Sequence, residues 1–172
     1  KVADLIAKKP VAIYGSYCLR ARLKQFSCNH CTNVCQVHAI TFTDNPQRPV
    51  KVDFALCNGC GACVSACPTG AFTMELGLKD YDLLKKTALT CQNTDTTLYF
   101  SCQAVTTELQ EQTVAIGGCF ARLHEGLFLG AAKFGAEQIK LITNNCENCG
   151  CQQFNFIQKQ LTATTNFLWR LG

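Results

Sequence analysis

The sequence predicts two parts, a cysteine-rich metal-binding module followed by a small α/β domain with a parallel sheet. Two observations carry this prediction. Eight of the fourteen cysteines fall between Cys18 and Cys67, most of them separated by two or three residues. Beyond residue 88, strand-like and helix-like segments alternate, as they do in parallel sheets. We therefore expect a first domain at residues 1–88 and a second domain at residues 89–172.

The composition fits a globular protein rather than a disulfide scaffold. Hydrophobic residues make up 48% of the 172 residues, which is enough for a core without covalent staples. Cysteines in tight turns also pair poorly with each other and converge naturally on a metal. The net charge of +4 is too mild to indicate nucleic acid. No apolar run approaches the roughly 18–20 residues of a membrane span, so we expect no transmembrane helix.

Part of the positive charge is concentrated near the start of the chain. Two interpretations stay open: a solvated basic arm, or a surface that docks an acidic partner or balances an anionic group bound beside Cys18 and Cys28. The residues concerned are Lys1, Lys8, Lys9, Arg20, Arg22 and Lys24.

An internal repeat with an offset of 32 residues organises the first part. Both copies share the pattern C-x2-C-x3-C-x3-A-[IF]-T. In the second copy Cys57 completes the run C-x2-C-x2-C-x3-C-P. In the first copy Gln25 occupies the equivalent position, and we expect Cys18, seven residues upstream, to supply the missing thiolate. The aligned cysteines are Cys28, Cys31 and Cys35 in the first copy and Cys60, Cys63 and Cys67 in the second.

These residue types suit a metal site that the chain wraps closely. Soft thiolates select iron–sulfur clusters or zinc over hard cations. We expect Gly59, Gly61 and Gly70 to adopt positive φ, which lets the backbone approach the bound group. Two zinc sites would use the same eight thiols, but zinc modules are usually built from separated C-x2-C pairs, so the pattern favours iron and sulfide.

The C-x2-C-x2-C-x3-C-P run is that of bacterial ferredoxins, and residues 18–76 resemble the bicluster ferredoxins, which hold two [4Fe-4S] clusters. The resemblance implies an α+β bicluster ferredoxin-like domain, followed here by the small α/β domain with a parallel sheet. The sequence departs from the family in the long loop 18–28 and at Gln36, where the second copy has Pro68. The ligands that the resemblance implies are Cys18, Cys28, Cys31 and Cys67 for the first cluster, and Cys35, Cys57, Cys60 and Cys63 for the second.

The second part combines strand and helix patterns. A polar, largely helical stretch at residues 79–86 leads to the isolated Cys91. Between the second and third predicted strands, apolar residues recur at intervals of four, four and three, which predicts a helix that stops at Gly135. A final helix begins at about Gln152. The predicted strands are residues 97–101, 113–117 and 138–143, and the helical stripe is Leu123, Leu127, Ala131 and Phe134.

The remaining cysteines follow the predicted strands. Carboxyl ends of parallel strands share one edge of a sheet, where open α/β folds bind ligands. The pattern therefore predicts a third metal centre, held by Cys102, Cys119 and two of the last three cysteines. Two alternatives stay open: buried small hydrophobic side chains, and a redox disulfide at Cys146 and Cys149. We expect Cys91 to be structural. The five strand-end cysteines are Cys102, Cys119, Cys146, Cys149 and Cys151.

Residues 98–151 resemble the delta subunit of methyl-viologen-reducing hydrogenases. The resemblance lies in S-C at a strand end, the segment VAIGGCFARLHEGLFLGAAKFGAEQIKLI and the terminal cysteine group. It implies a [2Fe-2S] cluster and electron transfer toward heterodisulfide reductase. The sequence departs from that family in having Cys102 alone in the first segment and a C-x2-C-x-C ending.

These observations together predict an iron–sulfur electron-transfer subunit of a multisubunit anaerobic oxidoreductase. We expect two [4Fe-4S] clusters and a third cluster, with [2Fe-2S] favoured. The expected partners are hydrogenase, dehydrogenase or flavin-bearing subunits, with no nucleic acid, and the expected location is the cytoplasm. Catalysis would occur elsewhere, because no serine or histidine constellation indicates hydrolysis and His30, His38 and His124 fit ordinary packing or solvent exposure.

Two other functions stay open. In the first, the ferredoxin-like part feeds electrons to a dithiol at Cys146, Cys149 or Cys151, which makes the protein a thiol or disulfide reductase. In the second, the protein is a zinc or iron–sulfur scaffold or redox sensor on nucleic acid, which salt-dependent DNA binding would reveal.

Overall fold

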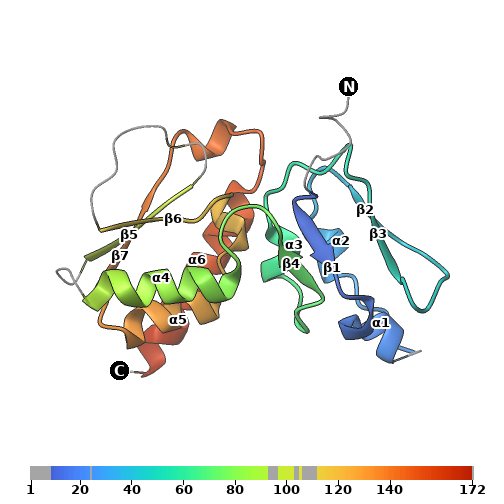
Figure 1. The fold of residues 1–172 in the computed structure, drawn as a ribbon, viewed down its shortest axis with the longest axis horizontal. Helices are drawn as coiled ribbons and strands as arrows, with labels where there is room; N and C mark the ends of the chain where they lie inside the picture. Colours follow the sequence, from blue (N-terminus) through green and yellow to red (C-terminus); the bar gives the residue numbers. More distant parts are fainter. Residues whose placement is uncertain (1–8, 24, 93–96, 103–104, 106–111, 172) are drawn as a thin grey trace.

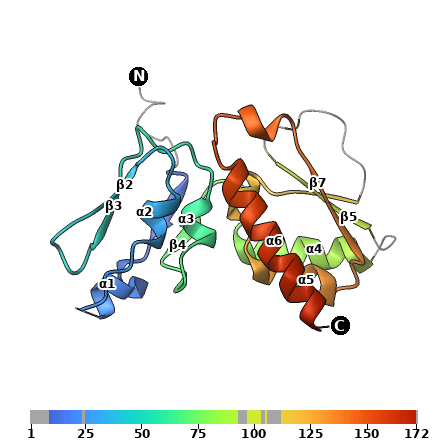
Figure 2. The ribbon, with the colours of Figure 1, turned by 180° about the vertical axis from the view of Figure 1, so that it is seen from behind.

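The computed structural model describes residues 9–23, 25–92, 97–102, 105 and 112–171. Lys1, Lys8 and Lys24 of the basic segment lie outside the described residues. The chain forms two lobes that lie side by side in both views (Figures 1 and 2). The first lobe contains the elements up to β4, and the second lobe contains those from α4 onward.

The first lobe combines antiparallel strand pairs with short helices, as an α+β domain does. Strand β1 pairs with β4, and β2 pairs with β3. The repeat is visible in the structure, because β2 and β4 differ in position by the same 32 residues as the cysteines. The elements are β1 (Val11–Ile13), a 3-10 turn (Gly15–Tyr17), α1 (Leu19–Arg22), α2 (His30–Val34), β2 (Ile40–Phe42), β3 (Val50–Val52), α3 (Ala62–Ser65) and β4 (Phe72–Met74).

The second lobe contains a parallel sheet of three strands, as the sequence pattern predicts. Strand β5 lies in the centre and pairs in parallel with both β6 and β7. In both views α4 and α5 lie below the strands, and α6 runs from the height of the strands down to α5. The elements are α4 (Asp80–Gln92), β5 (Thr97–Ser101), β6 (Thr113–Ala115), a 3-10 turn (Phe120–Arg122), α5 (Glu125–Lys133), β7 (Gln138–Ile142), a 3-10 turn (Cys146–Asn148) and α6 (Phe154–Leu171).

Strand β6 ends two residues earlier than its apolar pattern predicts. Gly117 has φ of 65°, which takes the chain out of the extended conformation. Its backbone passes so close to Gly77 that a Cβ on Gly117 would lie 2.6 Å from the Cα atom of Gly77. The close approach of two chain segments therefore overrides the local strand preference of the sequence.

Residue 88, where we place the domain boundary, lies inside α4. This helix contacts α5 and β6, and its Leu83 is fully buried in the core of the second lobe. Most residues of this helix are polar because they lie on its solvent-exposed face, so the sequence gives little sign that the opposite face packs against the second lobe. We propose that the chain divides between Met74 and Asp80 instead.

The two lobes share part of their core. Ala62 of α3 belongs to the same buried cluster as Phe120 and Ala121 of the second lobe. The Ser65 hydroxyl donates a hydrogen bond of 2.5 Å to the Ala121 carbonyl. Gly61 packs against Arg122 so closely that a Cβ there would lie 2.6 Å from the Arg122 Cβ.

Arg122 is fully buried at this junction. Its guanidinium donates to the carbonyls of Ile116 and Leu78 at 2.7 and 2.5 Å and forms an ion pair with Asp80 at 2.9 Å. A buried charge is tolerated only with such partners. Arg122 thus ties the start of α4 to the turn that follows β6.

Within the part of the chain that the structure describes, no helix is both long and apolar enough to cross a membrane.

Candidate metal centres

The four cysteines predicted to hold the first cluster line one small cavity, together with Pro68 and Phe72 among other residues. Burial raises the pKa of the Cys31 thiol to about 11, and the three other thiols of the set add to the rise. Four thiols this close repel one another as thiolates, and a bound cation would relieve that repulsion. We call Cys18, Cys28, Cys31 and Cys67 the first thiolate set.

The other predicted set lines a second small cavity with mostly apolar walls, which include Val11, Ile40 and Val52. Burial raises the pKa of the Cys63 thiol, with further contributions from Cys60 and Cys57. The structure thus brings together two groups of four cysteines, with the crossed membership that the ferredoxin resemblance implies. We call Cys35, Cys57, Cys60 and Cys63 the second thiolate set.

Backbone hydrogen bonds to sulfur recur with the repeat. The Ala39 amide donates to the Cys35 sulfur at 3.3 Å, and the Ala71 amide donates to the Cys67 sulfur at the same distance. The Thr69 hydroxyl lies 3.7 Å from the Cys67 sulfur, and it would donate to this sulfur as a thiolate. Such bonds stabilise negative charge on cluster ligands. The expected positive φ angles are confirmed at 70°, 80° and 65° for Gly59, Gly61 and Gly70.

These observations fit [4Fe-4S] clusters. Each cavity offers four soft thiolates, apolar walls and an amide N–H directed at a ligand sulfur, which is the environment that iron–sulfur clusters require. Within the described ranges, no group of three histidine, cysteine or acidic side chains is arranged to hold a single metal ion.

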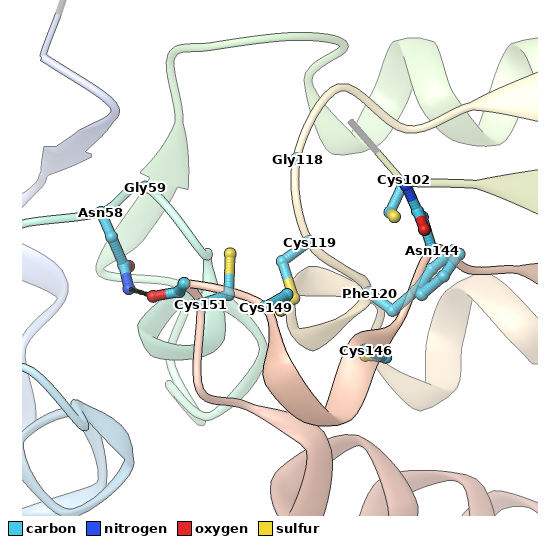
Figure 3. Close-up of a pocket in the computed structure, with 11 residues that line it drawn as sticks. Asn58, Gly59, Cys102, Gly118, Cys119, Phe120, Asn144, Cys146, Cys149 and Cys151 are labelled. Carbon is cyan, nitrogen blue, oxygen red and sulfur yellow. Dashed lines mark hydrogen bonds between the residues drawn. The ribbon is translucent and has the colours of Figure 1, made fainter. Parts of the chain in front are cut away.

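A larger cavity of about 390 Å³ lies at the carboxyl edge of the parallel sheet. All five strand-end cysteines line it, and Asn58 and Gly59 of the first lobe line its far end. Figure 3 shows these side chains around the cavity, with Asn58 at one end and Cys102 at the other. The predicted convergence of thiols from three strand ends is therefore present. We call this space the strand-end cavity.

Neighbouring thiols in the strand-end cavity interact directly. Cys151 accepts a hydrogen bond from Cys119, which lowers the pKa of Cys151 and raises that of Cys119. Cys149 also hydrogen-bonds Cys151 and Cys146. Burial raises the pKa of Cys146, and Cys149 and Cys102 add to the rise. The five thiols thus form one electrostatically coupled group.

Cys91 lies apart from this group. It is partly buried against the core of the second lobe, and burial raises its pKa. It lines none of the three cysteine cavities.

Two residues of these sites have no signal in the sequence. The Asn58 amide donates to the Gly150 carbonyl at 3.1 Å, a bond across 92 residues that is drawn in Figure 3. Gln153 donates to the Val34 carbonyl across 119 residues. Only the three-dimensional fold brings such distant partners together, and the start of a helix is all that local pattern predicts at Gln153.

Comparisons with known proteins bear on the first lobe. Residues 26–74 match the family described as a 4Fe-4S dicluster domain. The ferredoxin-type protein NapF of Haemophilus influenzae is 42% identical over 56 residues, 31% of this chain and 31% of that protein. A tetrathionate reductase subunit of Archaeoglobus fulgidus is 45% identical over 47 residues, 26% of this chain and 23% of that protein. NapF of Escherichia coli is 36% identical over 63 residues, 36% of this chain and 37% of that protein.

The chain therefore spans between 23% and 37% of the length of these curated relatives. No solved structure matches it. The resemblance of residues 98–151 to a hydrogenase delta subunit stays a prediction. The family match and the relatives agree with the two cysteine cavities, and we conclude that residues 26–74 belong to a 4Fe-4S dicluster domain of the ferredoxin type, with an iron–sulfur electron-transfer role.

Proposed function

We propose that the protein is an iron–sulfur electron-transfer subunit with three metal centres in series. The first and second thiolate sets hold the two [4Fe-4S] clusters. Each cluster supplies one-electron redox chemistry when bound. The apolar walls exclude water, and the Ala39 and Ala71 amides stabilise the charge on two ligand sulfurs.

The third centre occupies the strand-end cavity, with [2Fe-2S] favoured. The observation that carries this proposal is the single cavity that five cysteines line from the ends of three parallel strands. Four of the five serve as ligands. These four are Cys102, Cys119 and two of the three cysteines of the C-x2-C-x-C ending.

We place this subunit in a larger anaerobic oxidoreductase of the cytoplasm. One relative is by name a subunit of tetrathionate reductase, and two others are ferredoxin-type proteins, which supports a role beside a catalytic subunit. A hydrogenase, dehydrogenase or flavin-bearing subunit would deliver or accept the electrons.

Reductive titration of the anaerobically purified protein tests the proposal. Each [4Fe-4S] or [2Fe-2S] centre takes up one electron, so about three reducing equivalents per chain are expected. Uptake of only about two reducing equivalents per chain would refute the third centre but would still support the ferredoxin function. If the purified protein contains zinc and takes up no electrons, the proposed function is refuted altogether.

A thiol or disulfide reductase is the second candidate. It is favoured by the direct hydrogen bond between Cys119 and Cys151 in an open cavity, since a lowered pKa makes Cys151 the better nucleophile. Alkylation of the fully iron-loaded protein separates the two functions. Modification of two or more of the thiols of Cys146, Cys149 and Cys151 supports the reductase, whereas modification of only one of the three supports a bound cluster, which uses the other two as ligands.

A further inference from the structure

Gln153 makes an unusual contact between the lobes. It lies just before α6 in the second lobe, is 2% exposed, and donates from Nε2 to the Val34 carbonyl at 3.0 Å. The same nitrogen lies 3.6 Å from the sulfur of Cys60 in the first lobe. Both acceptors require the nitrogen of the amide rather than its oxygen, so the orientation of the Gln153 side chain is fixed.

The carbonyl oxygen of the Gln153 side-chain amide, Oε1, is buried at a cost in free energy. Among the described residues, Oε1 is buried without a hydrogen-bond partner. Burying an unpaired carbonyl oxygen is unfavourable. An apolar residue before α6 would avoid this cost, so the contacts of Nε2 are the distinctive contribution of the side chain.

Cys60 is also the member of the second thiolate set that packs against the buried core of the second lobe, near the strand-end cavity. Its neighbours Asn58 and Gly59 line that cavity, as Figure 3 shows. Cys60 interacts electrostatically with both Cys151 and Cys119. Its sulfur therefore lies between two groups of thiols, its own set and the group in the strand-end cavity.

We propose that Cys60 and Gln153 form the electron-transfer junction between the two lobes. Gln153 is a positioning residue that holds the Cys60 sulfur and stabilises its charge. The strand-end centre consequently exchanges electrons with the second thiolate set and not directly with the first. One electron leaves one centre as the other gains it, so no bond breaks and no co-reactant is needed. The order of electron exchange between the centres rests on the proposed third centre. The role of Gln153 requires only the second [4Fe-4S] cluster.

The structure supplies a matched contrast in the first thiolate set. Thr69 is the hydrogen-bonding side chain beside Cys67, as Gln153 is beside Cys60. Hydrogen bonds to cluster sulfur favour the reduced, more negative state and raise the reduction potential. Removing each donor should therefore lower the potential of one cluster and leave the other unchanged.

Redox titration of the full chain, followed by electron paramagnetic resonance, tests the role of Gln153. Gln153→Met keeps the length of the side chain and removes the donor, and it is expected to lower the potential of the second cluster only. Thr69→Val is expected to lower the potential of the first cluster only. Equal shifts of both clusters in Gln153→Met, or no shift, would overturn the role of Gln153.

The direction of transfer has its own test. In Cys18→Ala, which removes a ligand of the first set, the magnetic interaction between the strand-end centre and the second cluster should persist. Its loss in this variant would overturn the proposed order. A protein with two clusters and no third signal would refute the strand-end centre, while the potential shift in Gln153→Met would still stand.

Discussion

At the residue scale, Cys18 is the position where the chain departs most from the ferredoxin run. It comes from the long loop before the repeat, yet it is buried and lines the same cavity as Cys28, Cys31 and Cys67. Sequence alone could predict this, because Cys18 is the nearest cysteine upstream of the vacant position at Gln25. A ligand displaced along the chain in this way would be tolerated, because only its sulfur atom must reach the metal site.

Replacement of Cys18 tests this assignment. Cys18→Ala should lose the first cluster and reduce the iron content by about four atoms per chain, or by about one if a three-iron cluster remains. Iron and acid-labile sulfide analysis measures the change. Cys91→Ala is the control, since Cys91 lines none of the cysteine cavities, and it should keep the full iron content. Unchanged iron and unchanged resonance spectra in Cys18→Ala would contradict the assignment.

At the element scale, sequence periodicity predicts the second lobe well. Strand β5 has the predicted bounds, and α5 ends before Gly135, whose φ is 103°. The common location of the five cysteines could be predicted from the sequence, because the carboxyl ends of parallel strands lie at the same edge of a sheet. The shortened β6 could not be predicted, because its end depends on contact with Gly77, 40 residues upstream of Gly117.

The approach of Gly117 to Gly77 predicts a large loss of stability in Gly117→Ala. A left-handed alanine costs about 1–2 kcal/mol, and forcing a methyl group into packed backbone costs about 1–3 kcal/mol more. Thermal unfolding of the iron-loaded protein measures the effect as a lower midpoint.

Gly70→Ala is the matched control for Gly117→Ala. Both glycines have φ of 65°, but a Cβ at Gly70 would meet no atom within 4 Å. Gly70→Ala should therefore carry only the backbone cost. Equal midpoints for the two variants would show that the contact with Gly77 adds no strain.

At the scale of the whole molecule, the lobes are joined by packing, by polar contacts and by the site residues themselves. The sequence could predict two parts, but not that α4 packs against α5 and β6, nor that Ala62 enters the core of the other lobe. Asn58 and Gln153 escaped prediction for the same reason. Their partners lie 92 or more residues away, so no local pattern indicates them.

Arg122 is the main buried charge at the junction and should be needed for stability. In Arg122→Met, the Asp80 carboxylate and the carbonyls of Ile116 and Leu78 lose their donor. Leaving such groups unpaired costs about 1–3 kcal/mol for each one that stays buried. The thermal midpoint should fall by several degrees.

Lys79→Met is the control for Arg122→Met. Its ion pair with Glu75 spans 3.6 Å, and the Lys79 side chain is 60% exposed. Exposed pairs contribute about 0–1 kcal/mol, so the midpoint should scarcely move. A fall as large as that of Arg122→Met would refute the special role of the buried guanidinium.

The central claim is that the two clusters of the ferredoxin-type lobe connect to a third centre in the strand-end cavity. Iron and acid-labile sulfide analysis of the anaerobically purified protein and of Cys119→Ala tests it most directly. The wild-type protein should contain about ten to twelve irons per chain, and Cys119→Ala should approach eight. About eight irons in both proteins would contradict the third centre, and zinc without sulfide would contradict the whole account.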